Sequence, residues 1–391
     1  MGDKALRYLE VLQAKHPGLA PCVGQLADRY QRKLWHQLTV ALEDCLALPD
    51  LRQEGVLLPF YHSFVATFAH KLNPLRLAQL AVTVAQQGFA EPPQPQEAVA
   101  FLEGVSAALA ETKQPRLEQP TLFLRMHVAQ YQLSAGNVDA CKAAVSGAKD
   151  ELDRLHDVDP SVSAVVHASR SLYYKHEKDF AEFYKSSLLY LAFISSDALP
   201  EPVRLSLAVD ISLAALLGDN IYNFGELLLH PIIKVLDGSS YKWLAEMLAA
   251  FNHGDLHAYD ALCERHASAL NSQPALVAHE RALREKITIL CLMELIFNLP
   301  AEQRTIPLSE IATRTKLGGD GVEFLLMKTL SLKLIEGVID QVDSTVQVSW
   351  VQPRVLTLEQ AGGLKTRLDA WIGKVNKAAS TLEEERLGAL E

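Results

Sequence analysis

The sequence predicts a mainly α-helical protein in which helical repeats precede a small unit of two helices and a β-hairpin, followed by a C-terminal helix. Three observations support this fold class. Amphipathic stretches of helical length alternate with turns rich in Pro, Gly and polar residues along most of the 391 residues. Residues 334–356 alternate between apolar and polar side chains as a hairpin does. An apolar seam with helical spacing follows them.

Four similar turns recur along the middle of the chain. In each of them a polar turn precedes an apolar residue, and a second apolar residue follows three positions later. Successive turns lie about 40 residues apart, which is the period of a two-helix repeat. One helical hairpin cannot bury its own apolar face, so neighbouring hairpins stack into a solenoid. We therefore expect a TPR-like solenoid, with a non-repetitive helical bundle as the alternative. The first apolar residues of the four turns are Val138, Phe180, Ile221 and Leu256.

Composition and charge indicate the expected location of the protein in the cell and the partners that it is not expected to bind. Hydrophobic residues make up 49% of the chain, and the formal net charge is −10. Proteins that bind nucleic acids or anionic membranes usually do so through a basic surface, which such an acidic chain is not expected to have. No uncharged run reaches the length of a membrane span, and the N-terminus does not resemble a signal peptide. The five cysteines lie far apart in apolar helical patterns, which favours buried free thiols. We expect a protein of the cytoplasm and nucleus, without a membrane or nucleic-acid partner.

Residues from Thr305 onward have the element order of a winged helix. Two short predicted helices, joined by a glycine-rich turn, lead directly into the hairpin. In the last strand of that hairpin, Val346, Val348 and Trp350 alternate with polar residues. Because successive side chains of a strand point to opposite faces, we expect these three residues to share one apolar face.

A winged helix commonly binds DNA through its second helix, which then carries Arg, Lys, Asn or Gln near its N-terminus. Residues 320–324 of this chain read DGVEF instead. Between residues 305 and 354, five basic residues stand against six acidic ones, so contact with phosphate would be opposed. We interpret this unit as a winged helix that contacts proteins. A DNA-binding winged-helix regulator is the alternative from a different functional class.

The final helix carries an apolar seam with coiled-coil-like spacing. A terminal helix with such a seam needs a surface to lie against, either on its own domain or on another chain. We predict that the seam and the apolar face of the hairpin bind partner proteins, with docking on its own chain as the alternative for the helix. The predicted partner-binding residues are Val346, Val348, Trp350, Leu364, Leu368, Trp371, Val375 and Leu382.

Signatures of catalysis and of metal binding are missing from the sequence. It has no phosphate-binding glycine loop, nucleophile elbow, zinc-protease histidine pair or Cys-x-x-Cys. Glu294 lies in an otherwise apolar helix, and we expect a paired structural acid there rather than a catalytic one. We predict no catalytic residue, cofactor or metal. The nearest approach to a metal cluster, which we expect to be ordinary turn and surface residues, is His253, Asp255, His257, Asp260, Cys263 and His266.

Five stretches, in the same order along the chain, resemble a PCI-domain subunit of the lid of the proteasome regulatory particle. Long strings of this kind are more specific than any short motif, and together they run from residue 32 to residue 356. They are RKLWHQLT (32–39), YNFGELLLHPI (222–232), LCLMELIF (290–297), LLMKTLSLKLIEGVIDQVD (325–343) and WVQPRVL (350–356).

From the resemblance to the PCI family we expect N-terminal helical repeats at 1–165, a PCI module at 166–352 and a C-terminal helix at 353–391. Within the module, the helical part spans 166–300 and the winged helix 301–352. The resemblance implies a non-catalytic scaffold subunit that acts in ubiquitin-dependent protein degradation as part of a hetero-oligomer. It implies as partners other PCI-domain lid subunits and the MPN-domain deubiquitinase pair, with the ubiquitin receptor as a further candidate. A subunit of another PCI complex, such as the signalosome, is the alternative.

Overall fold

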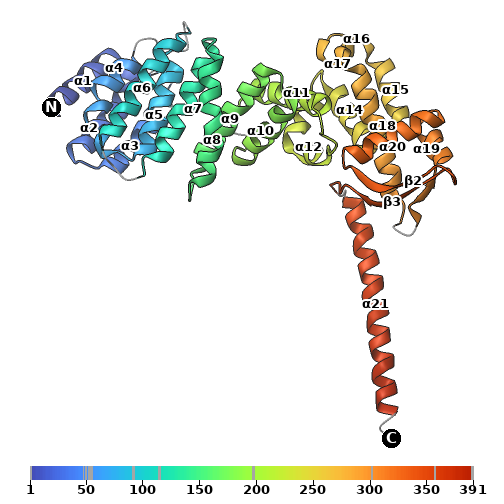
Figure 1. Ribbon diagram of the computed structural model, residues 1–391. Helices are drawn as coiled ribbons and strands as arrows, with labels where there is room; N and C mark the ends of the chain where they lie inside the picture. Colours follow the sequence, from blue (N-terminus) through green and yellow to red (C-terminus); the bar gives the residue numbers. More distant parts are fainter. Residues whose placement is uncertain are drawn as a thin grey trace. The chain divides into compact units, whose positions relative to one another are not determined.

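A computed structural model of the chain describes residues 2–46, 48, 51, 56–89, 93–112, 116–195, 199–300, 303–355 and 358–388. Its contacts divide the chain into two compact units, residues 1–200 and 201–391. Both units are mainly helical, as predicted (Figure 1). The expected boundary between residues 165 and 166 falls inside a continuous helix, Pro160–Glu177, and the division into domains stays a prediction.

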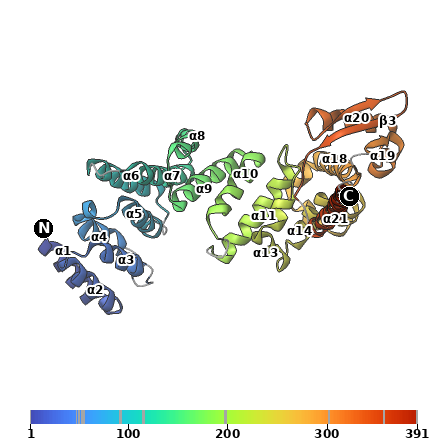
Figure 2. The same ribbon diagram turned by 90° about the horizontal axis from the view of Figure 1, so that it is seen from below.

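The first unit is a stack of helices in which successive elements pack side by side (Figures 1 and 2). One apolar core runs through it from Ala5 to Val166. Its α-helices are α1 (Gly2–Lys15), α2 (Ala20–Gln31), α3 (Trp35–Leu46), α4 (Leu57–Ser63), α5 (Pro74–Gly88), α6 (Pro95–Glu111), α7 (Glu118–Ser134), α8 (Val138–Arg154), α9 (Pro160–Glu177) and α10 (Phe180–Phe193). The 3-10 helices are η1 (Pro17–Leu19), η3 (Val65–Thr67) and η4 (Ala69–Lys71).

The second unit combines helices with one small sheet. Its helices are α11 (Glu201–Leu217), α12 (Gly225–Leu229), η6 (Pro231–Ile233), α13 (Lys234–Asp237), α14 (Lys242–His253), α15 (Leu256–Arg265), α16 (Ala267–Asn271), α17 (Pro274–Ala278), α18 (Glu280–Asn298), α19 (Leu308–Thr315), α20 (Gly319–Ser331) and α21 (Leu358–Gly388). The strands are β1 (Thr305–Pro307), β2 (Ile335–Asp340) and β3 (Thr345–Val351). Helices α18, α19 and α20 and the sheet share one apolar core.

The repeat turns predicted from the sequence mark the starts of helices. Helices α8, α10 and α15 begin at Val138, Phe180 and Leu256. The turn at Ile221 leads instead into the short helix α12, so the regular period is interrupted there. A helical repeat region followed by a winged helix is therefore confirmed.

Two aspartates explain why the chain starts a helix at these turns. The carboxylate of Asp179 accepts a hydrogen bond of 3.1 Å from the backbone N–H of Glu182. The carboxylate of Asp255 accepts one of 2.9 Å from the N–H of His257. The first N–H groups of a helix lack partners within the helix, so each side chain stabilises its helix start by about 1 kcal/mol.

The expectation that all five cysteines are free thiols is wrong for two of them. Cys22 in α2 and Cys45 in α3 form a disulfide, with their Cα atoms 6.1 Å apart. Packing of α2 against α3 brings these distant residues together, which their spacing in the sequence does not show. The other three, Cys141, Cys263 and Cys291, are free.

A buried histidine makes the first unit sensitive to acid. The ring of His127 in α7 is 7% exposed and lies 4.8 Å from the ring of Phe123. Burial, opposed by a hydrogen bond with Gln130, lowers the pKa of His127 to about 4. An unfolded chain binds the proton near pH 6.5, so this contribution to stability is complete above that pH and is lost as the pH falls toward 4.

We predict that the variant His127→Gln loses less stability on acidification than the parent protein. Between pH 7 and pH 5 the difference is expected to be roughly 2 kcal/mol, because only the parent chain takes up this proton on unfolding. Urea denaturation at the two pH values measures it. The matched control is His36→Gln, which removes an exposed histidine of α3. Equal acid sensitivity of the parent and the His127→Gln variant would contradict the prediction.

The C-terminal end of α11 is closed by a lysine from α18. The side chain of Lys286 is 8% exposed, and its Nζ donates hydrogen bonds of 2.8, 3.0 and 2.8 Å to the carbonyl oxygens of Ala215, Leu216 and Gly218. The last carbonyl groups of a helix have no partner within the helix and carry partial negative charge. Burial lowers the pKa of Lys286 to about 7. Its three hydrogen bonds join two helices that are distant in the sequence.

Candidate protein-binding site

The winged helix is built on a three-stranded antiparallel sheet with strand order β1-β3-β2. The hairpin of β2 and β3 was predicted from the sequence, and its turn spans residues 341–344. Strand β1 was missed, because three residues carry too short a pattern to be recognised. It pairs with β3 through Ile306, which lies opposite Val346. Among the strands that the structure describes, none pairs with the outer edge of β2.

A β-bulge interrupts the pairing of β2 with β3. Glu336 lies opposite Trp350 and Gly337 opposite Val348, so Ser349 is an extra residue on β3. A Cβ atom on Gly337 would overlap the carbonyl oxygen of Gln347, so glycine is required at this close approach. The bulge reverses the alternation of side chains after Val348.

This bulge corrects the prediction that three residues of β3 present one apolar face to a partner. Val346 and Val348 are 0% and 3% exposed, and both belong to the winged-helix core. Trp350 points the other way and is 39% exposed, while Val351 takes the buried position after it. Only Trp350 of the three is therefore available to another chain.

The outer face of α20 carries large apolar side chains that the sequence reading did not single out. The predicted stripe of α20 is buried at Val322, Leu325 and Leu326. On the opposite side, Phe324 and Met327 are 65% and 63% exposed. Their spacing of three residues places them on one helix face, and a second, weaker apolar stripe is the signal that could have found them.

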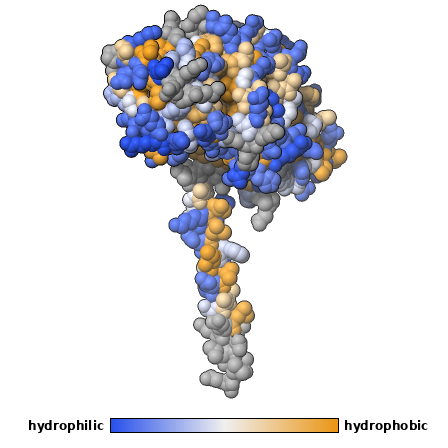
Figure 3. All heavy atoms as spheres, turned by 90° about the vertical axis from the view of Figure 1, so that its left-hand side faces the viewer, coloured by the Kyte–Doolittle hydropathy of each residue, from blue (hydrophilic) through white to orange (hydrophobic). Residues whose placement is uncertain are grey.

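The predicted seam of the C-terminal helix α21 is exposed along its described length. Figure 3 shows apolar residues along one side of this helix, with hydrophilic residues on the other. Side chains of residues 361–382 are all exposed, so none of them docks on another part of the chain here. Ile372 also lies on this side and was not among the predicted residues. The exposed apolar residues are Leu364, Leu368, Trp371, Ile372, Val375 and Leu382.

The segment before α21 is anchored to the helical part of the second unit. Nη1 of Arg354 lies 2.6 Å from a carboxylate oxygen of Glu294 in α18, and the Arg354 side chain is 8% exposed. Its Nη2 donates to the carbonyl oxygen of Asn252 at the end of α14. Beside it, Val355 packs so closely on Gly225 that a Cβ atom at that glycine would lie 2.7 Å from the Cβ of Val355. Glu294 is therefore a paired structural acid.

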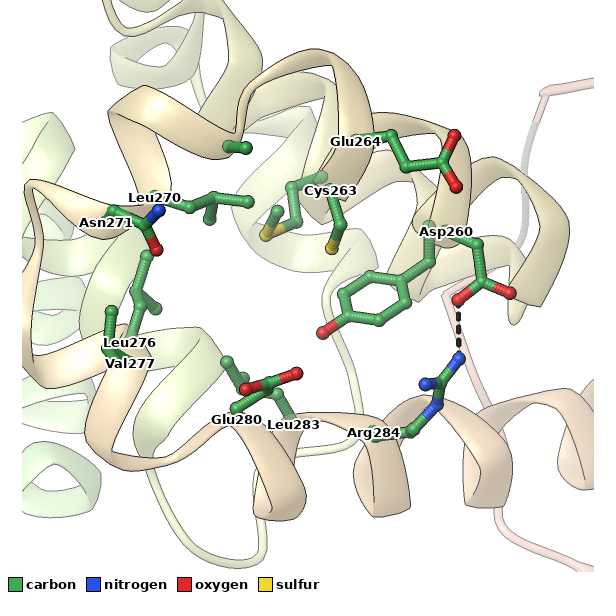
Figure 4. A pocket seen from close by; sticks show the side chains of 13 residues that line it. Asp260, Cys263, Glu264, Leu270, Asn271, Leu276, Val277, Glu280, Leu283 and Arg284 are labelled. Carbon is green, nitrogen blue, oxygen red and sulfur yellow. Dashed lines mark hydrogen bonds and ion pairs between the residues drawn. The ribbon is translucent and has the colours of Figure 1, made fainter.

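The pocket shown in Figure 4 lies among helices α14 to α18 and has a volume of about 470 Å³. Burial opposes ionisation of Asp260 at its rim, but hydrogen bonds and charge from Lys316 and Arg284 outweigh burial and lower its pKa. The carboxylate lies 2.6 Å from Arg284 and 3.2 Å from Lys316. Cys263 lines the same pocket, and burial raises the pKa of its thiol, so it is protonated near neutral pH.

Two of the residues considered as a metal cluster have other roles. Asp255 caps α15, and Asp260 forms ion pairs that join α15 to α18 and α19. Among the residues that the structure describes, no group of three or more His, Cys, Asp and Glu residues is placed to hold a metal ion. None of the described helices is long and apolar enough to cross a membrane.

Helical repeats that lead into a winged helix define the class of PCI-domain proteins. A family model of the PCI domain matches residues 263–350. A second model, described as PSD13 N-terminal repeats, matches residues 22–248.

Whole-length relatives agree with these matches. The chain is 49% identical to the 26S proteasome non-ATPase regulatory subunit 13 homolog A of Arabidopsis thaliana, over 97% of this chain and 98% of the relative. It is 34% identical to the 26S proteasome non-ATPase regulatory subunit 13 of Dictyostelium discoideum, over 98% of this chain and 97% of the relative. It is 32% identical to the 26S proteasome regulatory subunit RPN9 of Saccharomyces cerevisiae, over 94% of this chain and 93% of the relative. The chain belongs to the family of the 26S proteasome non-ATPase regulatory subunit 13.

Proposed function

We propose that this chain is a non-catalytic scaffold and assembly subunit of the lid of the proteasome regulatory particle, acting in ubiquitin-dependent protein degradation. The observation that carries the proposal is the exposed apolar seam of α21, in a chain whose relatives are named proteasome regulatory subunits. Six large apolar side chains on one face of a helix are costly in water, so a partner surface stabilises them by burial.

The winged helix supplies the second contact in this proposal. The outer edge of β2 presents backbone N–H and C=O groups that a strand of a neighbouring subunit can pair with. Val338 on β2 is 70% exposed, and Trp350 and the α20 face add apolar surface. The proposed neighbours are other PCI-domain lid subunits, the MPN-domain deubiquitinase pair and, as a further candidate, the ubiquitin receptor. The proposed locations are the cytoplasm and the nucleus.

The two alternatives have weaker support. A relative at 22% identity is named eukaryotic translation initiation factor 3 subunit M, from Aspergillus terreus, so other PCI complexes share part of the pattern. The identity to proteasome subunits is much higher over the same length. For DNA binding, the outer face of α20 offers Phe324 and Met327 where basic or amide side chains would be needed.

Native affinity purification tests the proposal. The tagged chain is expressed in its own cells, purified at low salt, and its partners are identified by mass spectrometry. We expect it to co-purify with PCI-domain and MPN-domain subunits in an assembly of proteasome size. Recovery as a free monomer, or with the subunits of another PCI complex, would contradict the assignment.

A further inference from the structure

The first unit contains an open apolar groove that the proposed lid contacts do not use. It lies between α6 and the segment formed by α4, η3 and η4, with a volume of about 680 Å³. Phe101 of α6 forms its floor together with neighbouring aromatic rings. The ring centroid of Phe101 is 5.1 Å from that of Tyr61, 6.1 Å from that of Phe89 and 5.7 Å from that of His62. The floor is therefore mainly aromatic.

The α6 wall of this groove is made of small residues. Ala100, Gly104 and Ala108 are exposed, line the groove and recur every four residues, so they follow one face of the helix. A Cβ atom placed on Gly104 would meet no other atom within 4 Å. Small side chains on a helix surface let a second helix approach closely, because the distance between helix axes depends on the side chains at the contact.

Two carboxylates flank these small residues. Glu97 lies one turn before Ala100 and Glu111 one turn after Ala108 on the same side of α6, and both are exposed. Neither forms an ion pair with a residue that the structure describes. At 1.5 Å per residue the two acids are about 21 Å apart along the helix axis. The groove thus has an apolar centre and an acidic group toward each end.

We propose that this groove docks an amphipathic helix of a partner protein, with aliphatic side chains in the cavity and Lys or Arg near both ends, opposite Glu97 and Glu111. A helix of about four turns matches the distance between the two acids, whereas a small molecule would span only part of it. Opposite charges at the rim select the partner more than they add affinity. This inference concerns the first unit and does not rest on the proposed lid function.

Synthetic peptides test the docking site on the full-length chain. The probe is a fluorescein-labelled amphipathic helix of about 18 residues with Leu on one face and Lys near both ends. A sister peptide carries Glu in place of each Lys. Fluorescence anisotropy is expected to show that the Lys peptide binds at least tenfold more tightly than the Glu peptide, with a preference that narrows as salt is added. The double variant Glu97→Lys, Glu111→Lys is expected to reverse this preference.

A matched pair of glycine variants locates the binding. Gly104→Leu places a side chain in the groove and is expected to weaken binding of the Lys peptide at least tenfold. Gly147→Leu in α8 is the control, because a Cβ atom there also meets no atom within 4 Å. It is expected to leave binding unchanged. Circular dichroism of both variants verifies that the helices form.

Three results would overturn the inference. They are failure of both peptides to bind, equal affinity for the Lys and Glu peptides, and equal weakening by Gly104→Leu and Gly147→Leu. Self-association of the parent chain that Gly104→Leu abolishes would assign the groove to a second copy instead of a partner. Analytical ultracentrifugation of the two chains distinguishes that case.

Discussion

Replacing Trp371 by Asp is expected to prevent incorporation of the chain into the lid while leaving the isolated chain folded. The Trp371 side chain is 62% exposed in the centre of the α21 seam, so its loss removes little packing within the chain. In an interface, a buried tryptophan typically contributes roughly 2 kcal/mol or more, which is about thirtyfold in affinity. A carboxylate in its place adds the cost of burying an unpaired charge.

Co-expression with the other lid subunits, followed by native gel electrophoresis, measures incorporation. Thermal unfolding of the isolated variant, followed by circular dichroism, measures whether it folds. Thr366→Asp is the matched control, because it introduces the same charge on the side of α21 opposite the seam, two residues from both Leu364 and Leu368. A truncation before Leu364 is expected to reproduce the effect of Trp371→Asp. Unfolding of the isolated Trp371→Asp chain would show that the seam docks within the chain instead.

Replacing Arg354 by Met is expected to destabilise the second unit by roughly 3 kcal/mol. The substitution leaves Glu294, whose side chain is 26% exposed, without its ion-pair partner and with only the 3.2 Å hydrogen bond from the Asn298 amide. It also leaves the carbonyl oxygen of Asn252 without its donor. It also removes the anchor that holds the segment before α21 against α14 and α18. The double variant Arg354→Met, Glu294→Met is expected to recover part of the loss, because it leaves no unpaired carboxylate.

Urea denaturation, with hydrogen exchange of peptides from α14 and α18, assigns this loss to the second unit. The control is Arg32→Met, which removes the ion pair of Arg32 with Asp28 on the surface of α2. Those side chains are 68% and 53% exposed, so the expected loss is below about 1 kcal/mol. Similar losses for Arg354→Met and Arg32→Met would refute a structural role of the buried pair.

Prediction from the sequence succeeded where the signal is local and repeated. Helices α8, α10 and α15 begin where polar turns precede paired apolar residues, and Asp179 and Asp255 cap two of them. The structural role of Glu294 was expected because an acid in an apolar helix needs a partner. The sequence did not show that this partner is Arg354, because 60 residues separate Arg354 from Glu294.

The candidate site was only partly predictable, because parts of it also depend on contacts between segments distant in the sequence. The exposed residues of α21, apart from Ile372, were singled out because helix periodicity shows which side chains share a face. Trp350 is exposed because the bulge, and not the strand alternation, turns it outward. Val346 and Val348 were misplaced because the apolar face of β3 packs on the helices of the winged helix and is not open to a partner. Phe324 and Met327 were overlooked because α20 has apolar side chains on two faces. Only the packing of the whole unit shows which face is buried and which is exposed.

The sequence by itself determined the helical repeats, the order of elements in the winged helix and the apolar seam of α21. Each of these depends on residues a few positions apart, whose spacing fixes which side chains lie together on one element. The tertiary structure alone decided the pairing of β1 with β3, the bulge that turns Trp350 outward, the Cys22–Cys45 disulfide and the groove beside α6. These features join segments distant in the chain, and their geometry depends on how whole elements pack rather than on any local pattern.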